Sequence, residues 1–592
     1  MAKVLSCLRN SNQKRTKGAP RPRSRPLSNR VTSRWKGFVL RLCLFSILLF
    51  GSLGAQPAPD SAARTAHLEG QVLSRAGEPL RKATLRLEAY YADRGSNPIS
   101  YTDTTDGAGK FVFEGVLPGR YILTAGRAGF LPQKYGARGA TNGSPGSVLT
   151  LAAGQSMKDL DFKLIPQGVI TGRVTDADGD PMPGIQVFAM QTYRTRGKRG
   201  LGPKGLAQTD DQGSFRIAGL SPGSYYVCTD DPQARQRAQD HSVRPGRVEN
   251  PASNVTTYYP DSVDASGATA LQVDAGSELR GIDIRIRRER VFSIRGLIID
   301  AVTGKPAKTD LSAHLPGSSR GYSDPAWQTS SREDGTFELR SLSPGEYVLM
   351  ASTSYRGERA YGREEVSIAD SDITGVKLTL EQGVTVTGTI KLEGDGPPSR
   401  LSVFLSDLGG SYGHAYTAGA TRDGTFEFHG VAPGKYDVRM ELMPDGAYIK
   451  SVQFGGQDVT HAMLDFTSGV NGTLDILLSP HAAEVSGTVK NKDGAATAGV
   501  EVTLWPKYGQ SKSVYRGSTD QNGDFRVAGL PPGDYYMNAW EDLDVYLSFD
   551  LDFLKRFASP ETTITLEEGA HQTAQPKLIS REDTAAEAAK LP

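Results

Sequence analysis

The stretch that decides the fold reads Asp211-Gln212-Gly213-Ser214-Phe215-Arg216-Ile217-Ala218-Gly219-Leu220-Ser221-Pro222-Gly223-Ser224-Tyr225. A glycine turn precedes the phenylalanine, and a Pro-Gly turn precedes a tyrosine that follows ten residues later. The same spacing occurs five times along the chain, which marks the sequence as a tandem repeat. The five aromatic pairs are Phe111 and Tyr121, Phe215 and Tyr225, Phe337 and Tyr347, Phe426 and Tyr436, and Phe525 and Tyr535.

The two turns predict strands on either side of them. Proline fixes φ and glycine accepts positive φ, so both Asp/Asn-Gly and Pro-Gly pairs reverse the chain. Alternate residues such as Phe215 and Ile217 then face one side of a strand. We therefore predict a β-hairpin in every repeat, with one buried aromatic on each arm.

Three further strands accompany each aromatic pair. The first lies about 40 residues before the phenylalanine and contains a glycine, as in Ile170-Thr171-Gly172-Arg173-Val174. Another follows a polar turn at 184–189, and an alternating strand such as 282–286 closes the unit. Short strands with regular turn signals and no sustained helical period are typical of antiparallel β-sandwiches. The one helical stretch that we expect is 549–557.

The amino-terminal segment has the features of a secretory signal. Residues 1–55 hold twelve Lys or Arg and no acidic residue, and 42–53 are almost wholly apolar. This block is shorter than the roughly 20 residues of a membrane-spanning helix, so we expect cleavage after Ala55, with an uncleaved anchor as the alternative. The remainder would carry a formal charge of −10 and one cysteine, Cys228, which excludes an intrachain disulfide.

The repeated motifs resemble the carboxypeptidase regulatory-like domain. That family is related to collagen-adhesin B-type, transthyretin-like and starch-binding β-sandwiches, and the resemblance covers about residues 66–580. It implies an all-β chain of tandem antiparallel sandwiches with a prealbumin or starch-binding-like fold, which in the family act as spacers, accessory folding domains and binding domains. The predicted segments are a signal peptide at 1–55, sandwiches at 66–166, 167–288 with basic loop insertions, 289–382, 383–480 and 481–580, and a disordered tail at 581–592. Five such units in line would form a rod of roughly 150 to 200 Å.

Reactive residues do not recur with the repeat. His481 and Glu484 form an H-x-x-E motif with His571 further on, as in zinc carboxypeptidases, but no segment of about 300 residues remains for such a catalytic domain. The acidic turns at 176–180 and 520–524 place glycine fourth, whereas a calcium-binding EF-hand loop places it sixth. We therefore predict no enzyme activity, metal or cofactor. The alternative is a set of accessory domains of a peptidase system, or an unrecognised zinc carboxypeptidase-type hydrolase.

Basic and aromatic residues offer a candidate binding surface. Loops of the second unit are rich in arginine and lysine, which attract anionic ligands, and tyrosine or tryptophan rings stack on sugars. The candidates are Arg194, Arg196, Lys198, Arg199, Arg235, Arg237, Tyr258, Tyr259 and Trp327. The sequence thus predicts a noncatalytic spacer and binding module, secreted or in the periplasm or cell envelope, with a role in adhesion. The expected partner is a polysaccharide or an envelope protein. We expect a monomer with no nucleic-acid partner and no membrane span in the mature chain.

Overall fold

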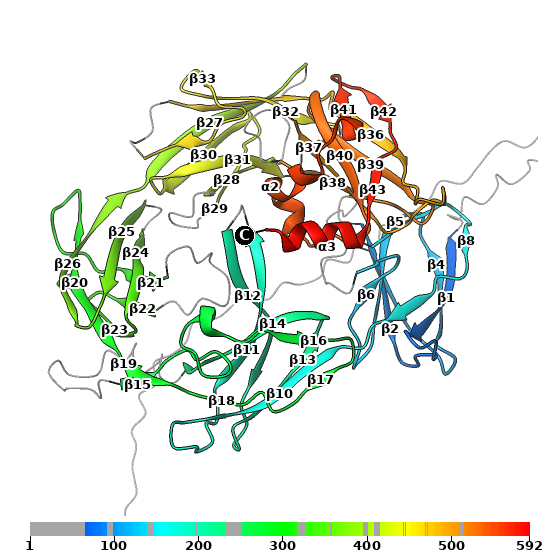
Figure 1. The fold of residues 1–592 in the computed structure, drawn as a ribbon. Coiled ribbons are helices and arrows are strands. Elements are labelled where there is room, and N and C mark those ends of the chain that lie inside the picture. The colour runs from blue at the N-terminus through cyan, green and yellow to red at the C-terminus, as the bar shows by residue number, and fades with distance from the viewer. Residues whose placement is uncertain are drawn as a thin grey trace, which may run out of the picture. The chain divides into compact units, whose positions relative to one another are not determined.

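A computed structural model describes residues 65–591 of the chain, with short gaps (Figure 1). The gaps are 91–98, 140–145, 196–197, 233–251, 316–326, 356–357, 395–400, 408–414, 442, 445, 468, 470–471 and 508–512. The predicted signal peptide therefore lies outside the described residues. Strands dominate the described part, which confirms the all-β fold class. The five sequence units are called repeats 1 to 5 below, and their predicted boundaries remain a prediction.

Repeat 1 folds into two sheets. Its strands are β1 (Ala66–Ser74), β2 (Thr84–Ala89), β3 (Ser100–Thr104), β4 (Lys110–Val116), β5 (Gly119–Gly126), β6 (Gln133–Lys134), β7 (Val148–Leu151), β8 (Ser156–Met157) and β9 (Phe162–Leu164). One sheet has the order β4-β1-β8 with β9 also on β1, and the other has the order β3-β2-β5-β6 with β7 also on β5. Buried side chains of both sheets, including Phe111 and Tyr121, form one hydrophobic cluster.

Repeat 2 has the same plan with longer excursions. Its elements are β10 (Gly168–Thr175), β11 (Gln186–Thr195), β12 (Lys198–Gln208), β13 (Ser214–Leu220), β14 (Gly223–Asp230), β15 (Ala252–Asn254), the 3-10 helix η2 (Ala265–Gly267), β16 (Leu271–Val273), β17 (Glu278–Leu279), β18 (Ile284–Arg285) and β19 (Arg288–Arg290). The sheets are β13-β10-β17 with β18 on β10, β12-β11-β14-β16, and the pair β15-β19. The core lies between the first two.

Repeat 3 differs because one strand joins its two sides. Its strands are β20 (Phe292–Asp300), β21 (Asp310–His314), β22 (Trp327–Ser330), β23 (Thr336–Leu342), β24 (Gly345–Tyr355), β25 (Glu358–Ile368) and β26 (Ile373–Gln382). They form a single sheet in the order β22-β21-β24-β25-β26-β20-β23. The long strand β25 pairs with β24 along its length and with β26 at Ala360 and Tyr361, which makes the sheet continuous.

Repeats 4 and 5 return to two sheets each. Repeat 4 contains β27 (Val384–Leu392), β28 (Ser402–Asp407), β29 (Ala415–Gly419), β30 (Thr425–Val431), β31 (Lys435–Glu441), β32 (Tyr448–Phe454), β33 (Gln457–Asp458), β34 (Leu464–Asp465) and β35 (Leu474–Ser479). Repeat 5 contains β36 (Ala483–Thr488), β37 (Glu501–Pro506), β38 (Tyr515–Ser518), β39 (Asp524–Leu530), β40 (Gly533–Trp540), η3 (Leu547–Phe549), α2 (Leu551–Leu554), η4 (Lys555–Phe557), η5 (Pro560–Thr562), β41 (Thr563–Leu566), β42 (His571–Thr573), β43 (Lys577–Ile579) and α3 (Arg581–Ala589). The orders are β30-β27-β35-β32-β33 and β29-β28-β31-β34 in repeat 4, then β39-β36-β42 and β38-β37-β40-β41 with β43 on β40 in repeat 5.

The aromatic pair is buried as predicted, but its two strands do not form a hairpin. All ten repeated Phe and Tyr side chains are at most 4% exposed. The Phe strand pairs with the first strand of its repeat, as β4 does with β1, whereas the Tyr strand pairs in the other half, as β5 does with β2. The Pro-Gly turn therefore crosses the core instead of closing a hairpin. The hairpin prediction was wrong because two amphipathic strands joined by a tight turn have the same sequence pattern whether they pair with each other or lie in opposite sheets. Only the strand pairing distinguishes the two arrangements.

The repeated glycine of the first strand has a packing role. In every repeat it lies in register opposite the repeated phenylalanine, as Gly70 does opposite Phe111. A Cβ at this glycine would lie within 1.9 to 2.3 Å of a carbonyl oxygen of the segment leading into or forming the closing strand. The glycines are Gly70, Gly172, Gly296, Gly388 and Gly487. Only a residue without a side chain allows this approach.

The repeated tyrosine also closes its own turn. In each repeat its hydroxyl donates a hydrogen bond of 2.8 to 2.9 Å to the carbonyl oxygen four residues earlier. A buried phenol needs such a partner, which explains why tyrosine and not phenylalanine follows the Pro-Gly turn.

The carboxyl-terminal end corrects one prediction and supports another. Residues 581–589, expected in a disordered tail, form α3, because the Ser580 side chain accepts a hydrogen bond from Asp583 N at 3.1 Å and caps the helix. The expected helical stretch at 549–557 corresponds to the end of η3, α2 and η4. No helix in the described residues is long and apolar enough to span a membrane.

Candidate functional site

The basic insertion of repeat 2 is a long β-hairpin and not a loop. Strands β11 and β12 pair from Gln186 opposite Gln208 up to Thr195 opposite Lys198, with a bulge after Ala189. Ladder hydrogen bonds thus extend to the end of the insertion, which the sequence analysis missed because the glycines of β12 read as loop signals. We call residues 186–208 the basic hairpin.

The candidate basic residues lie at the outer end of this hairpin. Arg194 is directly opposite Arg199 in register, and Lys198 is opposite Thr195. Arg196 lies outside the described residues. The side chains of Arg194, Lys198 and Arg199 lie outside the described part of the chain, so the register places only their backbone, and their role in binding stays a prediction.

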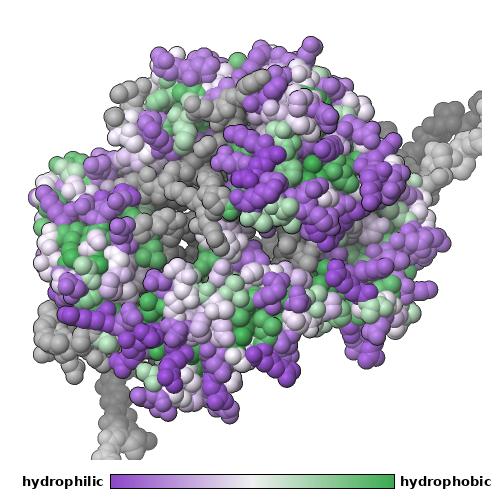
Figure 2. Space-filling model, in the orientation of Figure 1, coloured by the Kyte–Doolittle hydropathy of each residue, from purple (hydrophilic) through white to green (hydrophobic). Residues whose placement is uncertain are grey.

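The outer half of the hairpin packs against repeat 5. The rings of Tyr193 and Tyr546 have centroids 5.3 Å apart, and Lys204 Nζ lies 5.1 Å from the centroid of Tyr546. Stacking and a cation–π contact therefore hold this end of the basic hairpin. Figure 2 shows polar residues over most of one face of the molecule, with hydrophobic residues in separate groups.

Of the remaining candidates, Tyr258, Tyr259 and Trp327 lie in the described part of the chain. Arg235 and Arg237 lie outside the described residues. Tyr258 is half-buried in a turn closed by its own backbone hydrogen bonds to Ser262, and Tyr259 packs partly against the core of repeat 2. Ligand binding by these residues stays a prediction.

Trp327 belongs to the packing of repeat 3. Its ring meets Tyr347 edge to face at 5.3 Å, and its Nε1 donates a hydrogen bond of 3.0 Å to Ser341 O. A sugar stacked on Trp327 would bind a ring that already packs against the core of repeat 3. The role of Trp327 in binding stays a prediction.

Glu484 and His571 lie on β36 and β42 of repeat 5, and His481 precedes β36. Glu484 lies opposite His571 in the parallel register, and His481 O accepts a hydrogen bond from Gly569 N. The Glu484 carboxylate, however, lies 2.5 Å from Arg526 Nη2 in an ion pair. Among the described residues, no group of three or more His, Cys, Asp or Glu side chains could hold a metal ion.

The acidic turns use their carboxylates on their own backbone. Asp176 Oδ1 accepts hydrogen bonds from Asp178 N and Asp180 N, both at 2.9 Å. Asp520 Oδ1 does the same with Asn522 N and Asp524 N, at 2.8 and 3.0 Å. This Asx-turn geometry accounts for the leading aspartate of each turn.

Repeat 5 has a second core that the sequence analysis did not find. Trp505 and Trp540 lie on the outer face of the β37–β40 sheet and are covered by the helical segments, with Phe553 and Leu554 fully buried. Glu501, 3% exposed, lies beside this core with its Oε1 2.7 Å from Arg516 Nε. Burial raises the pKa of Glu501 to about 7, although the charge of Arg516 lowers it.

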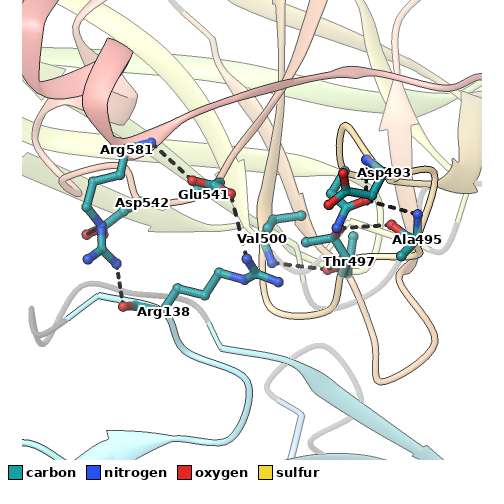
Figure 3. A network of polar contacts seen from close by, with 10 residues as sticks. Arg138, Asp493, Ala495, Thr497, Val500, Glu541, Asp542 and Arg581 are labelled. Carbon is teal, nitrogen blue, oxygen red and sulfur yellow. Dashed lines mark hydrogen bonds and ion pairs between the residues drawn. The ribbon is translucent and has the colours of Figure 1, made fainter.

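A polar network connects repeat 5 with repeat 1 (Figure 3). Arg581, at the start of α3, lies 3.2 Å from Asp542 through its Nε and donates a hydrogen bond of 2.5 Å to Arg138 O. Arg138 Nη1 lies 3.7 Å from Glu541 Oε1. Burial raises the pKa of Asp542, whereas the Arg581 charge lowers it.

Comparison with known proteins finds a family match in three regions of the chain. A family model, described as the carboxypeptidase regulatory-like domain, matches residues 67–165, 169–256 and 484–543. In these three regions the chain carries carboxypeptidase regulatory-like domains. This confirms the resemblance inferred from the repeated motifs.

The chain is also similar to other proteins over long stretches, at low sequence identity. The chain is 23% identical to Colossin-A of Dictyostelium discoideum over 498 residues, which is 74% of this chain but 4% of that much longer protein. A minor pilin of Streptococcus agalactiae is 14% identical, with 38% of this chain and 97% of the pilin covered and a TM-score of 0.21. The major pilin subunit of Bacillus cereus is 10% identical, with coverages of 53% and 99% and a TM-score of 0.13. Scores this low say nothing about the function of this chain.

Proposed function

We propose that the chain is an exported, noncatalytic protein of the cell envelope or extracellular space that acts as a spacer and binding module. One observation carries this proposal: the residues repeated five times are all used for the fold. The glycine admits the closing strand, the phenylalanine fills the core, and the tyrosine hydroxyl closes the turn. An active site shared by the repeats would leave a reactive residue at the same spacing.

The noncatalytic role can be tested directly. Purified protein comprising residues 56–592 should bind no stoichiometric zinc and should not cleave carboxyl-terminal residues from peptides. The matched control is His481→Ala, which removes the histidine of the H-x-x-E motif. Peptide hydrolysis in the parent chain that is lost in His481→Ala would overturn the proposal.

The basic hairpin is the ligand surface that we propose, with an acidic polysaccharide as the ligand. The register supports this choice, because positions 194 and 199, both arginine, are opposite each other on neighbouring strands, and opposed like charges favour a bound anion. Outside residues 1–55 the chain is acidic overall, so the attraction is local to the basic hairpin and should weaken as salt shortens the screening length.

A charge-matched pair of variants tests this ligand surface on an array of acidic and neutral glycans. Arg194→Glu with Arg199→Glu should bind acidic glycans about tenfold more weakly, because two lost charge contacts together amount to about 1.4 kcal/mol. The control is Arg216→Glu with Arg285→Glu, which changes the net charge equally at exposed positions of the same repeat. Equal binding by both variants, or no binding to any glycan, would refute the polysaccharide ligand. Cross-linking to an envelope protein through the hairpin would replace it with a protein partner.

A further inference from the structure

Repeats 1 and 5 contact each other although they lie far apart in the sequence. Strand β7 of repeat 1 places Val148 in a parallel bridge with Asp520 of repeat 5. The side-chain amide of Gln521 bonds both backbone groups of Thr150, two residues further along β7. Thr150 N donates to Gln521 Oε1 at 3.2 Å, and Gln521 Nε2 donates to Thr150 O at 3.3 Å. The outer edge of β7, which would otherwise expose unpaired backbone groups, is thus partnered by the turn at 520–523 of repeat 5.

The ionic cluster of Figure 3 forms a second contact between the same repeats. Arg581 forms an ion pair with Asp542 of its own repeat and donates a hydrogen bond to the carbonyl oxygen of Arg138. The Arg138 side chain in turn forms an ion pair with Glu541. The two acidic residues directly follow β40, whose end positions them beside the first turn of α3. The cluster therefore depends on the folded carboxyl-terminal segment of repeat 5.

Two glycines show how close the surfaces come. A Cβ at Gly499 would lie 1.9 Å from Gly136 O, and one at Gly139 would lie 2.4 Å from Asp542 Oδ1. These contacts involve backbone on at least one side, so the two surfaces fit closely and not only through long flexible side chains. The contacts are mainly polar and charged, as in interfaces that form and separate.

We propose that repeats 1 and 5 form a specific, reversible docking interface within one chain, held by the ionic cluster and the β7 edge. The charged side chains remain partly accessible, at 42% for Arg138, 46% for Arg581, 30% for Glu541 and 21% for Asp542, so salt can screen them. Weak contacts suffice because two parts of one chain meet at an effective concentration on the order of millimolar. Undocking would allow the rod of five repeats expected from the sequence, whereas docking excludes it. The interface does not depend on the proposed ligand, so a silent glycan array leaves it untouched.

Cysteine cross-linking of residues 56–592 measures the docking. Thr150→Cys with Asn522→Cys places two thiols at exposed positions just beyond the Val148–Asp520 bridge, where a short bismaleimide can join them. The native Cys228 does not interfere, because it is buried and burial raises the pKa of its thiol to about 12. The matched control is Thr150→Cys with Asp423→Cys, since Asp423 holds the same place in the turn of repeat 4 as Asn522 does in repeat 5.

We expect the docked pair to cross-link within one chain at least tenfold faster than the control pair. The rate should fall severalfold between about 0.01 M and about 1 M salt, as the screening length drops from about 30 to about 3 Å. Arg581→Ala should cause a similar fall, whereas Lys590→Ala, which removes an exposed cation at the end of α3 that pairs with Glu587, should not. Emission of the buried Trp505 and Trp540, measured with Trp327→Phe in every variant, checks that repeat 5 stays folded.

Three results would overturn the proposal. Equal rates for the docked and control pairs would mean that the interface does not form. Cross-links found mainly between two chains would assign the surfaces to an intermolecular contact. A rate unchanged by salt and by Arg581→Ala would mean that the contact is neither ionic nor reversible.

Discussion

Replacing Gly487 with alanine should destabilise repeat 5 by a mechanism specific to this fold. The glycine lies on β36 opposite Phe525, and an added Cβ would lie 1.9 Å from Ala574 O and 3.2 Å from Phe525 Cε1. Since real Cβ atoms essentially never approach another heavy atom below 3.0 Å, the strands must separate by about 1.1 Å. The closing segment then loses the hydrogen bond from Ala574 N to Ser486 O, now 2.9 Å long.

The size of the effect follows from these contacts. Overpacking a close contact costs about 1 to 3 kcal/mol, and a lost backbone hydrogen bond adds about 1 kcal/mol. We therefore expect the free energy of unfolding of repeat 5 to fall by about 2 to 4 kcal/mol. With a urea dependence of about 1 to 2 kcal/mol/M for a unit of this size, the unfolding midpoint should fall by roughly 2 M.

Tryptophan emission can report repeat 5 alone. In residues 56–592 carrying Trp327→Phe, the remaining tryptophans are Trp505 and Trp540, both buried in repeat 5. Urea titrations of Gly487→Ala are compared with Ser486→Ala, a neighbouring change on the same strand that should leave the midpoint within about 0.3 M. If Gly487→Ala has the same midpoint as this control, the closing segment does not pass over the glycine and the packing described for all five repeats is wrong.

Three further predictions concern single side chains. Phe426→Ala should cost about 3 to 5 kcal/mol and remove the calorimetric transition of repeat 4, whereas Gly434→Ala should leave it nearly unchanged, because Gly434 is not among the positive-φ glycines and its nearest neighbour is 3.5 Å away. Tyr535→Phe should lower the urea midpoint of repeat 5 by an amount worth about 1 kcal/mol, since Pro531 O loses its hydrogen bond of 2.8 Å; an unchanged midpoint would deny the hydroxyl this role. The pKa of Glu501 is raised from 4.5 to about 7, so the folded state holds its proton more tightly, and the resulting stability, at most about 3 kcal/mol, is complete below pH 4.5 and is lost as the pH rises to about 7. Urea midpoints at acidic and alkaline pH should therefore differ less in Glu501→Gln than in the parent chain, and equal differences would contradict the raised pKa.

The candidate site shows where sequence reasoning ends. The basic residues of repeat 2 were visible as composition, but the pairing of Arg194 with Arg199 follows from a register that spans the whole insertion. Glu501 and Arg516 lie fifteen residues apart on neighbouring strands, and nothing in their spacing distinguishes a buried ion pair from two solvated charges. From the sequence alone, Trp327 is compatible with stacking on a sugar and with packing in the core. Only the structure shows its ring contact with Tyr347.

The sequence by itself determined the number of aromatic pairs, the turns, the all-β class and the burial of Phe and Tyr. These features are local, since a turn residue or an alternating strand depends on neighbours within a few positions. Which strands pair was decided only by the tertiary structure: the Pro-Gly turn crosses the core, and β25 of repeat 3 joins both halves of its sheet. The contacts of Arg138 with Glu541 and of Thr150 with Gln521 are also beyond sequence patterns, because pairing between residues this far apart depends on how whole surfaces fit.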